Sequence, residues 1–401
     1  MMSKEKWRVP KLRFPGFTED WEQRELAELC NVYDGTHQTP RYTNSGVMFV
    51  SVENIKTLES DKYISEDDFK NEFKIFPEFG DILLTRIGDV GSANIILDNI
   101  KRAYYVSLAL LKPKGVNSLF LLALLSSASV QSEIWKRTLH IAFPKKINKN
   151  EISKVIVSKP SILEQKKIGE LIYALDQIIT LHQHKLDNLK LKKKALLQKL
   201  FPKNGERYPE LRFPGFTDAW EQRKFSDLYE KISEKNDLSY SLDKIISVAN
   251  MYYKSDAKVS NEEYLKTYNI FRYGEIAFEG NKSKDFAYGR FVENTIGDGI
   301  ISHVFEVFRP ISKYDIYFWK YYINYEPIMG KVLSRCTKKT TMMTNLVGKD
   351  FLKETVLVPT LAEQKQIGTL LNALDKSITL HQRKLDHLQL QKKALLQQMF
   401  V

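Results

Sequence analysis

Two stretches of the 401-residue chain place apolar side chains at alternating steps of four and three residues. They cover residues 160–201 and 359–400. Such spacing, kept over about four heptads, is typical of a coiled-coil seam rather than of a helix on a globular surface. The pattern predicts two helices of about 40 residues, each roughly 60 Å long. The seam positions are Ile172, Leu175, Ile179, His182, Leu186, Leu189, Lys193, Leu196 and Leu200, then Leu371, Leu374, Ile378, His381, Leu385, Leu388, Lys392, Leu395 and Met399.

Proline and glycine mark the expected ends of these helices. Pro160 and Pro359 stand where each helix would begin, and Pro202 follows the end of the first. Between them, residues 163–200 contain no proline and a single glycine, Gly169, while good helix formers dominate.

The two stretches are copies of one another, 199 residues apart. Residues 160–201 and 359–400 are identical at 27 of 42 positions. A second pair at the same offset, LRFPGFTEDWEQR (12–24) and LRFPGFTDAWEQR (211–223), differs at only two positions. The chain is therefore built from two copies of one unit.

Each predicted helix carries an apolar stripe that it cannot bury alone, so pairing with its duplicate is the simplest arrangement. Two similar units that pack through one stripe tend towards twofold symmetry, which favours an antiparallel pair, although the sequence leaves the direction open. His182 and His381 fall at core positions of the seam. A metal-binding or pH-sensing pair is one interpretation; a polar, register-setting residue is the one we favour. Lys193 and Lys392 are expected to extend their ammonium groups out of the seam.

The segments between the repeats read as mixed α and β bodies that differ from one another. One short echo, Gly80–Leu83 against Gly274–Ala277, needs an offset of 194. The aromatic run 314–322 fits a base-stacking platform or, as we favour, the core of a helix. Expected strands are 47–52, 81–84, 95–97, 300–308 and 355–358, and expected helices lie near 118–139 and 314–333.

The fold class that follows is α+β, with two globular bodies separated by a pair of long, antiparallel coiled-coil helices and an internal pseudo-twofold repeat. The segments are a repeat box (1–24), a first body (25–158), a first helix (159–202), a linker with the second box (203–223), a second body (224–357) and a second helix (358–401).

Positive charge is in excess, with 61 Lys and Arg against 49 Asp and Glu, a net charge of +12. The two helical stretches carry +7 of this, which fits either a solvated helix face or contact with a polyanion. Loops in both bodies mix basic residues with Asn, Gln, His and Tyr, the types that reach phosphates and base edges. The candidate DNA-binding residues are His37, Gln38, Arg41, Tyr42, Asn44, Arg86, Lys145, Lys146, Asn250, Tyr252, Tyr253, Lys254, Asn281, Lys282, Lys284, Arg335, Lys338 and Lys339; Gln38, Asn44, Arg86, Asn250 and Asn281 are the favoured base-edge contacts.

Other classes of protein are disfavoured by what the sequence lacks. Two cysteines, Cys30 and Cys336, exclude a disulfide framework and a cysteine-based zinc site. No phosphate-binding loop, dinucleotide fingerprint or paired set of catalytic groups stands out, so we expect no metal site, no bound cofactor and no catalysis by this chain. Neither a signal peptide nor an apolar stretch of about 18 residues is present, and we expect a cytoplasmic protein without a membrane span.

The repeated boxes, the helix openings LEQKKI (163–168) and AEQKQI (362–367), and the dissimilar bodies resemble the DNA-specificity subunit of type I restriction–modification systems. The resemblance spans essentially the whole chain. It implies two target recognition domains, each reading one half of a bipartite, asymmetric site on double-stranded DNA, and helices that set the gap between the half-sites.

The resemblance also implies partners. Two methyltransferase (modification) subunits would dock on the helices, and restriction/translocase subunits would complete the larger complex. S-adenosylmethionine, ATP and Mg2+ would then belong to those partners and not to this chain. The main alternative from another class is a coiled-coil scaffold that joins two protein-binding domains without nucleic acid; a tandem transcription regulator is a third.

Overall fold

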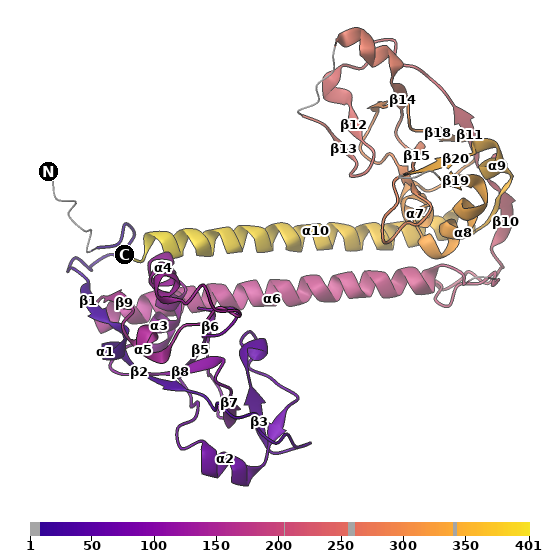
Figure 1. Cartoon of the computed structure of the whole chain (residues 1–401). Helices are drawn as coiled ribbons and strands as arrows, with labels where there is room; N and C mark the ends of the chain where they lie inside the picture. The colour runs from indigo at the N-terminus through magenta and orange to yellow at the C-terminus, as the bar shows by residue number, and fades with distance from the viewer. Residues whose placement is uncertain (1–8, 204, 256–260, 340–342) are drawn as a thin grey trace. The chain divides into compact units, whose positions relative to one another are not determined.

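The computed structural model describes residues 9–203, 205–255, 261–339 and 343–401 (Figure 1). Two compact units divide these residues. Unit 1 holds the described residues up to His184 together with Gln382–Val401, and unit 2 holds those from Lys185 to His381. The predicted mixture of helix and sheet is confirmed, and each unit contains parts of both long helices.

The long helices α6 (Ile162–Leu200) and α10 (Leu361–Gln398) are unbroken elements of 39 and 38 residues. In unit 1, Asp176 of α6 pairs with Lys392 of α10 at 2.5 Å, while Ile168, earlier on α6, shares a core with Met399, which follows the end of α10. This order shows that the two segments run antiparallel there.

In unit 2 the same arrangement recurs with the roles of the helices exchanged. Lys193 of α6 lies 2.6 Å from Asp375 of α10, and Leu200 shares a core with Ile367. The antiparallel direction, which the sequence favoured without settling, is thus present within each unit.

The seam positions are buried or half-buried in each unit. Eight of them are less than a tenth exposed and the others are half-buried. Lys193 and Lys392, which we expected to extend out of the seam, instead place their ammonium groups on aspartates of the facing helix. The eight are Ile172, Leu186, Leu200, Leu371, Leu374, Leu385, Leu388 and Met399, and the half-buried set, apart from the two lysines, is Leu175, Ile179, His182, Leu189, Leu196, Ile378, His381 and Leu395.

Unit 1 contains a four-stranded antiparallel sheet in the order β2-β8-β5-β6. Side chains on one face, such as Ile82 and Leu84, pack on helices, and those on the other, such as Leu83 and Leu110, pack on a three-stranded sheet in the order β4-β3-β7. Burial of both faces explains the continuous apolar runs of β5 and β8. The strands are β1 (Glu22–Glu25), β2 (Cys30–Asp34), β3 (Val47–Val50), β4 (Tyr63–Ile64), β5 (Ile82–Thr85), β6 (Ala93–Ile95), β7 (Arg102–Tyr104), β8 (Leu108–Pro113) and β9 (Ile156–Lys159).

Helices gather beside the first part of α6 in this unit (Figure 1). The pair β1-β9 closes the globular part of unit 1 by joining the segment after the first repeat box to the strand just before α6. The shorter helical elements are α1 (Leu26–Leu29), η1 (Val52–Asn54), α2 (Glu66–Glu72), α3 (Ser118–Leu125), α4 (Ala128–Arg137) and α5 (Lys149–Ser153).

Unit 2 repeats the four-stranded sheet and the closing strand pair of unit 1, although its sequence lacks register-by-register similarity to unit 1; in place of the three-stranded sheet it has the two-stranded pairs β12-β13 and β14-β17. Its four-stranded sheet has the order β11-β18-β15-β16, and β10-β21 is the counterpart of β1-β9. The sequence echo at offset 194 falls on matching strands, since Gly80 precedes β5 and Gly274 precedes β15. The strands are β10 (Glu221–Lys224), β11 (Tyr229–Ile232), β12 (Ile246–Ser247), β13 (Tyr252–Tyr253), β14 (Asn269–Phe271), β15 (Ile276–Glu279), β16 (Arg290–Glu293), β17 (Gly299–Ile301), β18 (Val307–Pro310), β19 (Thr337–Lys339), β20 (Thr344–Leu346) and β21 (Thr355–Val358).

The late helix expected in each body is two helices. In unit 1 the break falls at Ser127, whose hydroxyl caps α4 by accepting from Val130 N (3.4 Å). In unit 2 the break precedes α8, which carries Pro327 in its first turn. The expected strand 300–308 is likewise two strands, β17 and β18. The remaining helical elements are η2 (Phe225–Asp227), η3 (Leu242–Lys244), η4 (Glu262–Thr267), α7 (Ile316–Tyr322), α8 (Glu326–Cys336) and α9 (Gly348–Lys353).

The aromatic run 314–322 forms core, as we favoured, because Phe318, Trp319, Tyr321 and Tyr322 of α7 are all buried. Its position matches that of the apolar helix α3 in unit 1.

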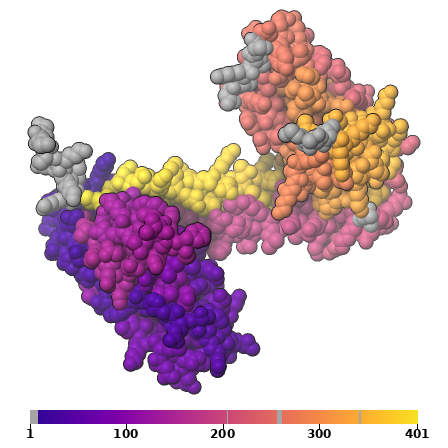
Figure 2. All heavy atoms as spheres, viewed as in Figure 1, coloured from indigo at the N-terminus to yellow at the C-terminus, as the bar shows by residue number. Residues whose placement is uncertain are grey.

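The tryptophan of each repeat box joins the end of a long helix to the core. Trp21 lies edge-on to Phe120 of α3 and to Phe400, with ring centroids 5.9 and 6.0 Å apart. In unit 2, Trp220 has the same relation to Phe318 (5.9 Å) and Phe201 (6.5 Å). Each such aromatic pair adds about 0.5–1.5 kcal/mol beyond the burial of its area. Figure 2 shows the last turns of α10, in yellow, against the indigo and magenta surface of unit 1.

The Glu-Gln pair at each helix opening explains the repeated box. Arg13 donates two hydrogen bonds to Glu164, at 2.9 and 2.7 Å, and Glu164 is 1% exposed. The next residue, Gln165, accepts from Asn117 N (3.0 Å) and donates to Pro160 O (2.9 Å), so it ties α6 to the start of α3.

The second copy repeats this set of hydrogen bonds. Arg212 binds Glu363 at the same two distances, 2.9 and 2.7 Å. Gln364 accepts from Asp315 N (3.1 Å) and donates to Pro359 O (3.1 Å). The repeated sequence therefore encodes one joint between box, long helix and body, used twice.

Candidate nucleic-acid interface

In unit 1, two loops that carry candidate residues lie side by side at the end of the four-stranded sheet. One loop follows β5 (86–91) and the other follows α4 (139–147). Backbone bonds join them: Gly88 N donates to Lys145 O (2.8 Å) and Ile147 N donates to Arg86 O (2.9 Å). The two loops, far apart in the sequence, thus share one surface.

Arg86 is buried and is engaged by other residues of unit 1. It is 7% exposed, its guanidinium forms an ion pair with Asp34, and its Nε donates to Ile147 O at 3.2 Å. Arg86 therefore holds together the loops around it, and DNA contact by Arg86 stays a prediction. A buried arginine of this kind is held because an unpaired buried charge is strongly unfavourable.

The loop at residues 139–147 presents apolar and cationic groups together. Ile141 is 99% exposed and Phe143 is fully exposed, while Lys145 and Lys146 are exposed beside them. Lys145 Nζ stands 4.6 Å from the centroid of the Trp135 ring. Lysines of this kind neutralise phosphates, and apolar side chains at a loop tip can wedge between base steps. Sequence reasoning chose the lysines and missed Ile141 and Phe143.

Residues 37–44 form the third candidate segment of unit 1. Tyr42 is anchored, with its ring edge-on to the buried Phe49 at 5.7 Å. Thr43 N donates to Tyr63 O at 2.9 Å, which fixes the segment to β4. All five candidates on this segment are exposed on that anchored backbone: His37, Gln38, Arg41, Tyr42 and Asn44.

Unit 2 brings together the equivalent pair of loops. The loop after β15 is bonded to the β19-β20 hairpin, since Thr344 N donates to Gly280 O (2.8 Å) and Asn281 bridges to Met343. Lys339 Nζ lies 5.4 Å from the centroid of the Tyr288 ring. The candidates exposed on these two loops are Asn281, Lys282, Lys284, Lys338 and Lys339.

A further arginine, Arg290 of β16, connects the loop at residues 249–254, which carries other candidates of unit 2, to the end of β15. Its Nε donates to Glu279 at 2.8 Å and its Nη2 donates to Ala249 O at 2.7 Å. Sequence reasoning missed Arg290, because its pairing with Glu279 depends on a cross-strand register that only the structure shows.

The loop at residues 249–254, which Arg290 binds, is exposed to solvent at only some of its side chains. Asn250, Tyr252 and Lys254 are exposed, whereas Tyr253 is half-buried. The Tyr253 hydroxyl donates to Asp298 O at 3.0 Å, so this tyrosine supports the loop.

Arg335 is also engaged within the chain. Its Nε donates to both oxygens of Glu354, at 3.0 and 2.9 Å, in a fork-like pair next to α8. The guanidinium is thereby directed at a carboxylate of its own unit, and its contact with phosphate stays a prediction.

Both cysteines are buried thiols. Burial raises the pKa of the Cys30 thiol, and also that of the Cys336 thiol, to about 12, which keeps both protonated and unreactive. Within the described residues, no cluster of three or more His, Cys, Asp or Glu side chains is arranged to hold a metal ion.

In the described part of the chain, no single helix is long and apolar enough to span a membrane. Only the bent pair α3 and α4 meets the requirement of length and composition jointly.

Leucines on the outer surface of the long helices are exposed at matching positions of the two copies. Unit 1 exposes Leu181 and Leu390, and unit 2 exposes Leu380 and Leu191, each by about two thirds. Apolar side chains that face water in both copies offer contact area to another protein.

Comparison with known proteins gives a consistent picture. The sequence profile of the type I restriction modification DNA specificity domain matches residues 18–191 and again residues 217–390. These two matches fall on the two copies of the repeat and together cover most of the chain.

Solved structures resemble the chain over its whole length. The type I restriction–modification S subunit from M. genitalium has a TM-score of 0.65 at 13% identity, covering 98% of this chain and 99% of that one. An HsdS subunit from Thermoanaerobacter tengcongensis has a TM-score of 0.42 at 16% identity, covering 100% and 99%. The first likeness supports the fold described above.

Proposed function

This chain belongs to the type I restriction–modification DNA specificity family, and on that basis we propose that it is the subunit through which such a complex selects its DNA sequence. Each globular body would act as a target recognition domain for one half of a bipartite, asymmetric site on double-stranded DNA. We assign no catalytic step to this chain.

One observation carries the proposal. Both units join the loop after an equivalent strand, β5 or β15, to a basic loop or hairpin that follows the late helix pair. The framework beneath these loops is the same, but the exposed side chains on them differ. A shared framework with different exposed residues is what two readers of two different half-sites require.

The decisive experiment maps methylated adenines in cells with and without this chain. We expect one two-part sequence to lose its methylation when the chain is absent. Exchanging residues 25–158 for the corresponding body of another member should change one half-site and leave the other intact. An unchanged methylation map, or a change in both halves after the exchange, would refute the proposal.

Phosphate binding by the loops is tested through salt dependence. Replacing Lys145 and Lys146 by alanine should lower DNA affinity and reduce the slope of log K against log salt by about 2, one for each phosphate that the variant no longer neutralises. The double variant of Lys338 and Lys339 is the matched control for the other unit. Hydroxyl-radical footprints should lose protection over one half-site in the first variant and over the other half-site in the second.

We propose that α6 and α10 set the gap between the half-sites. Half-sites read on one face of the duplex lie about 34 Å apart per helical turn, a span shorter than a helix of about 40 residues. Inserting one heptad into each helix, so that the seam keeps its register, should lengthen the gap in the methylated sequence and preserve both half-sites. Abolished methylation with no new gap would argue against a spacing role.

Two methyltransferase subunits are the proposed partners on the helices, with restriction/translocase subunits in the full complex. The cofactors S-adenosylmethionine, ATP and Mg2+ would be bound by those partners. The matched exposed leucines support docking of two copies of one protein. Replacing Leu181 and Leu380 by aspartate should abolish co-purification with the methyltransferase, whereas the same change at Lys166 and Lys365, also exposed, should not. Equal loss in both variants would refute docking at the leucines.

A scaffold that joins two protein-binding domains is the competing function. It predicts no sequence-selective retention on DNA and weak salt dependence, so the two DNA experiments above distinguish it directly.

A further inference from the structure

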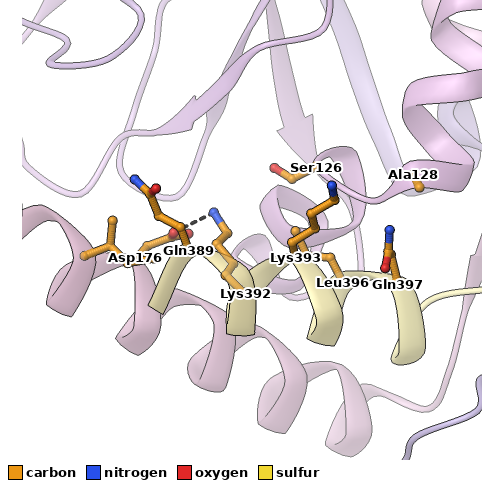
Figure 3. Close-up of a pocket in the computed structure, with 9 residues that line it drawn as sticks. Ser126, Ala128, Asp176, Gln389, Lys392, Lys393, Leu396 and Gln397 are labelled. Carbon is orange, nitrogen blue, oxygen red and sulfur yellow. Dashed lines mark ion pairs between the residues drawn. The ribbon is translucent and has the colours of Figure 1, made fainter. Parts of the chain in front are cut away.

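Unit 1 contains a cavity of about 520 Å³ between the α3–α4 turn, α6 and the last turns of α10 (Figure 3). This volume lies within the range of about 300–1,000 Å³ that is usual for small-molecule sites. Asp176 and Ile179 line it from α6, and Lys392, Lys393 and Leu396 line it from α10. Its floor is the Asp176–Lys392 ion pair, 2.5 Å long.

The repeated joint between long helix and body allows the two units to be compared residue by residue here. Asn117 N binds Gln165, and Asp315 N binds Gln364, so α3 and α7 start at the same place relative to their long helices. Counting forward from these two residues, Ala123 of α3 occupies the position of Tyr321 in α7.

Tyr321 shows what the equivalent place in unit 2 holds. Its hydroxyl donates to Asp375 Oδ2 at 2.6 Å, and its ring centroid lies 5.0 Å from Lys193 Nζ. Lys193 itself pairs with Asp375 Oδ1 at 2.6 Å. A phenol is thus held by one carboxylate oxygen and by the cation that pairs with the other.

Unit 1 has the same ion pair as unit 2 but lacks a tyrosine at the position of Tyr321. Asp176 and Lys392 are the direct repeats of Asp375 and Lys193, but residue 123 is alanine. Small side chains at Ser126 and Ala128 stand where unit 2 has the larger Asn324 and Glu326. Lys392 pairs with Oδ1 of Asp176, and the Asp176 side chain remains about a third exposed.

We propose that this cavity binds a tyrosine side chain supplied by a protein partner. The phenol hydroxyl would donate to Asp176, and the ring would lie against Lys392, as Tyr321 does in unit 2. The partner's tyrosine would thereby complete in unit 1 an interaction that unit 2 makes with its own chain. This inference does not depend on the proposed reading of DNA.

The probe for this site is N-acetyl-tyrosinamide, titrated into the full chain and followed by methyl NMR of Ile179 and Leu396. We expect saturable shifts with a Kd on the order of 1 mM, as is usual for a ligand of this size. N-acetyl-phenylalaninamide, which lacks the hydroxyl, should bind at least about fivefold more weakly because the Asp176 oxygen then stays unpaired.

Variants locate the site and give matched controls. Ala128→Tyr, at a residue that lines the cavity, should fill it and abolish probe binding. Tyr321→Ala should open a second site and raise the stoichiometry from one to two. Asp176→Asn should remove the preference for the tyrosine probe over the phenylalanine probe. Asp375→Asn, its direct repeat in unit 2, should leave that preference unchanged because Tyr321 already occupies that place.

Several results would overturn the proposal. Saturable binding of p-cresol without binding of N-acetyl-tyrosinamide would show a small-molecule site in place of a docking site. Equal binding of the two amides would show an apolar pocket without the phenol interaction. No shift with either amide, or full binding by Ala128→Tyr that remains folded, would show that this cavity takes no tyrosine.

Discussion

Replacing Gly169 by alanine should destabilise the chain, although the change favours helix formation in general. Gly169 lies within α6, where alanine is intrinsically better than glycine by about 1 kcal/mol. A Cβ added there would lie 2.5 Å from Phe120 N and 2.9 Å from both Leu119 C and Asn117 Oδ1. Ordinary contacts between such atoms are about 3.5–4.0 Å, so the start of α3 would have to move by about 1 Å.

The magnitude follows from what that movement disturbs. Overpacking of a well-packed core costs about 1–3 kcal/mol. The hydrogen bond from Asn117 N to Gln165 is placed at risk as well, and a bond of this type contributes about 0.5–1.5 kcal/mol. Subtracting the helix-propensity gain leaves a net decrease of about 2 kcal/mol in the free energy of unfolding.

Urea unfolding combined with hydrogen exchange of peptides from α3 measures the effect in unit 1. Ala174→Gly, at an exposed position of the same helix, is the control for propensity and should cost about 1 kcal/mol. Gly368→Ala should repeat the result in unit 2, because a Cβ there would lie 2.6 Å from Phe318 N. A gain in stability for Gly169→Ala would refute the close packing of α3 on α6.

Three further predictions concern buried polar and aromatic groups. Arg13→Ala should destabilise unit 1 by about 3 kcal/mol, because it leaves the buried Glu164 carboxylate unpaired. Arg212→Ala should destabilise unit 2 by the same amount, and urea unfolding measures both effects. A destabilisation by only one of the two variants would contradict the equivalence of the two Arg–Glu pairs. Glu293 of unit 2 is 2% exposed, neither of its oxygens accepts a hydrogen bond from the described residues, and burial raises its pKa well above the usual value. Above the ordinary carboxyl pKa the unfolded chain loses this proton while the folded chain keeps it, so stability should fall by about 1.4 kcal/mol per pH unit until the raised pKa is passed. Glu293→Gln should remove that slope, and identical pH profiles for the two proteins would show that Glu293 ionises normally. Phe400→Ala should cost unit 1 about 3–5 kcal/mol, because the ring is buried against Trp21, and thermal unfolding that leaves unit 1 unaffected would contradict this packing.

The sequence predicted correctly those features that depend on neighbouring residues, and it predicted less well those that depend on contacts between distant residues. The long helices, their seam and the strand 355–358 were predicted correctly because the period of apolar positions is a property of neighbouring residues. The late helices were located but not their breaks, since a single serine or proline decides where a helix is capped and restarted.

The sequence predicted some residues of the candidate interface and missed others. The sequence correctly placed Lys145 and Lys146 on an exposed loop, because a run of polar residues next to proline predicts a turn. It offered no means of distinguishing them from Arg86, whose burial depends on Asp34, a residue more than fifty positions away. Arg290 was missed for the same reason, since its role arises from Glu279 and Ala249 together.

The residues alone establish that this protein is a duplicated unit with two long helices, each carrying an apolar stripe, because a repeat and an apolar period are visible without knowing any long-range contact. Three-dimensional packing was needed to show that Phe400 completes the core around Trp21 and that Phe201 completes the core around Trp220. The core of unit 1 is thus completed by the residue that follows α10, and the core of unit 2 by the residue that follows α6. Nothing local encodes that choice, because either helix end would satisfy the same apolar pattern; the antiparallel pairing selects it.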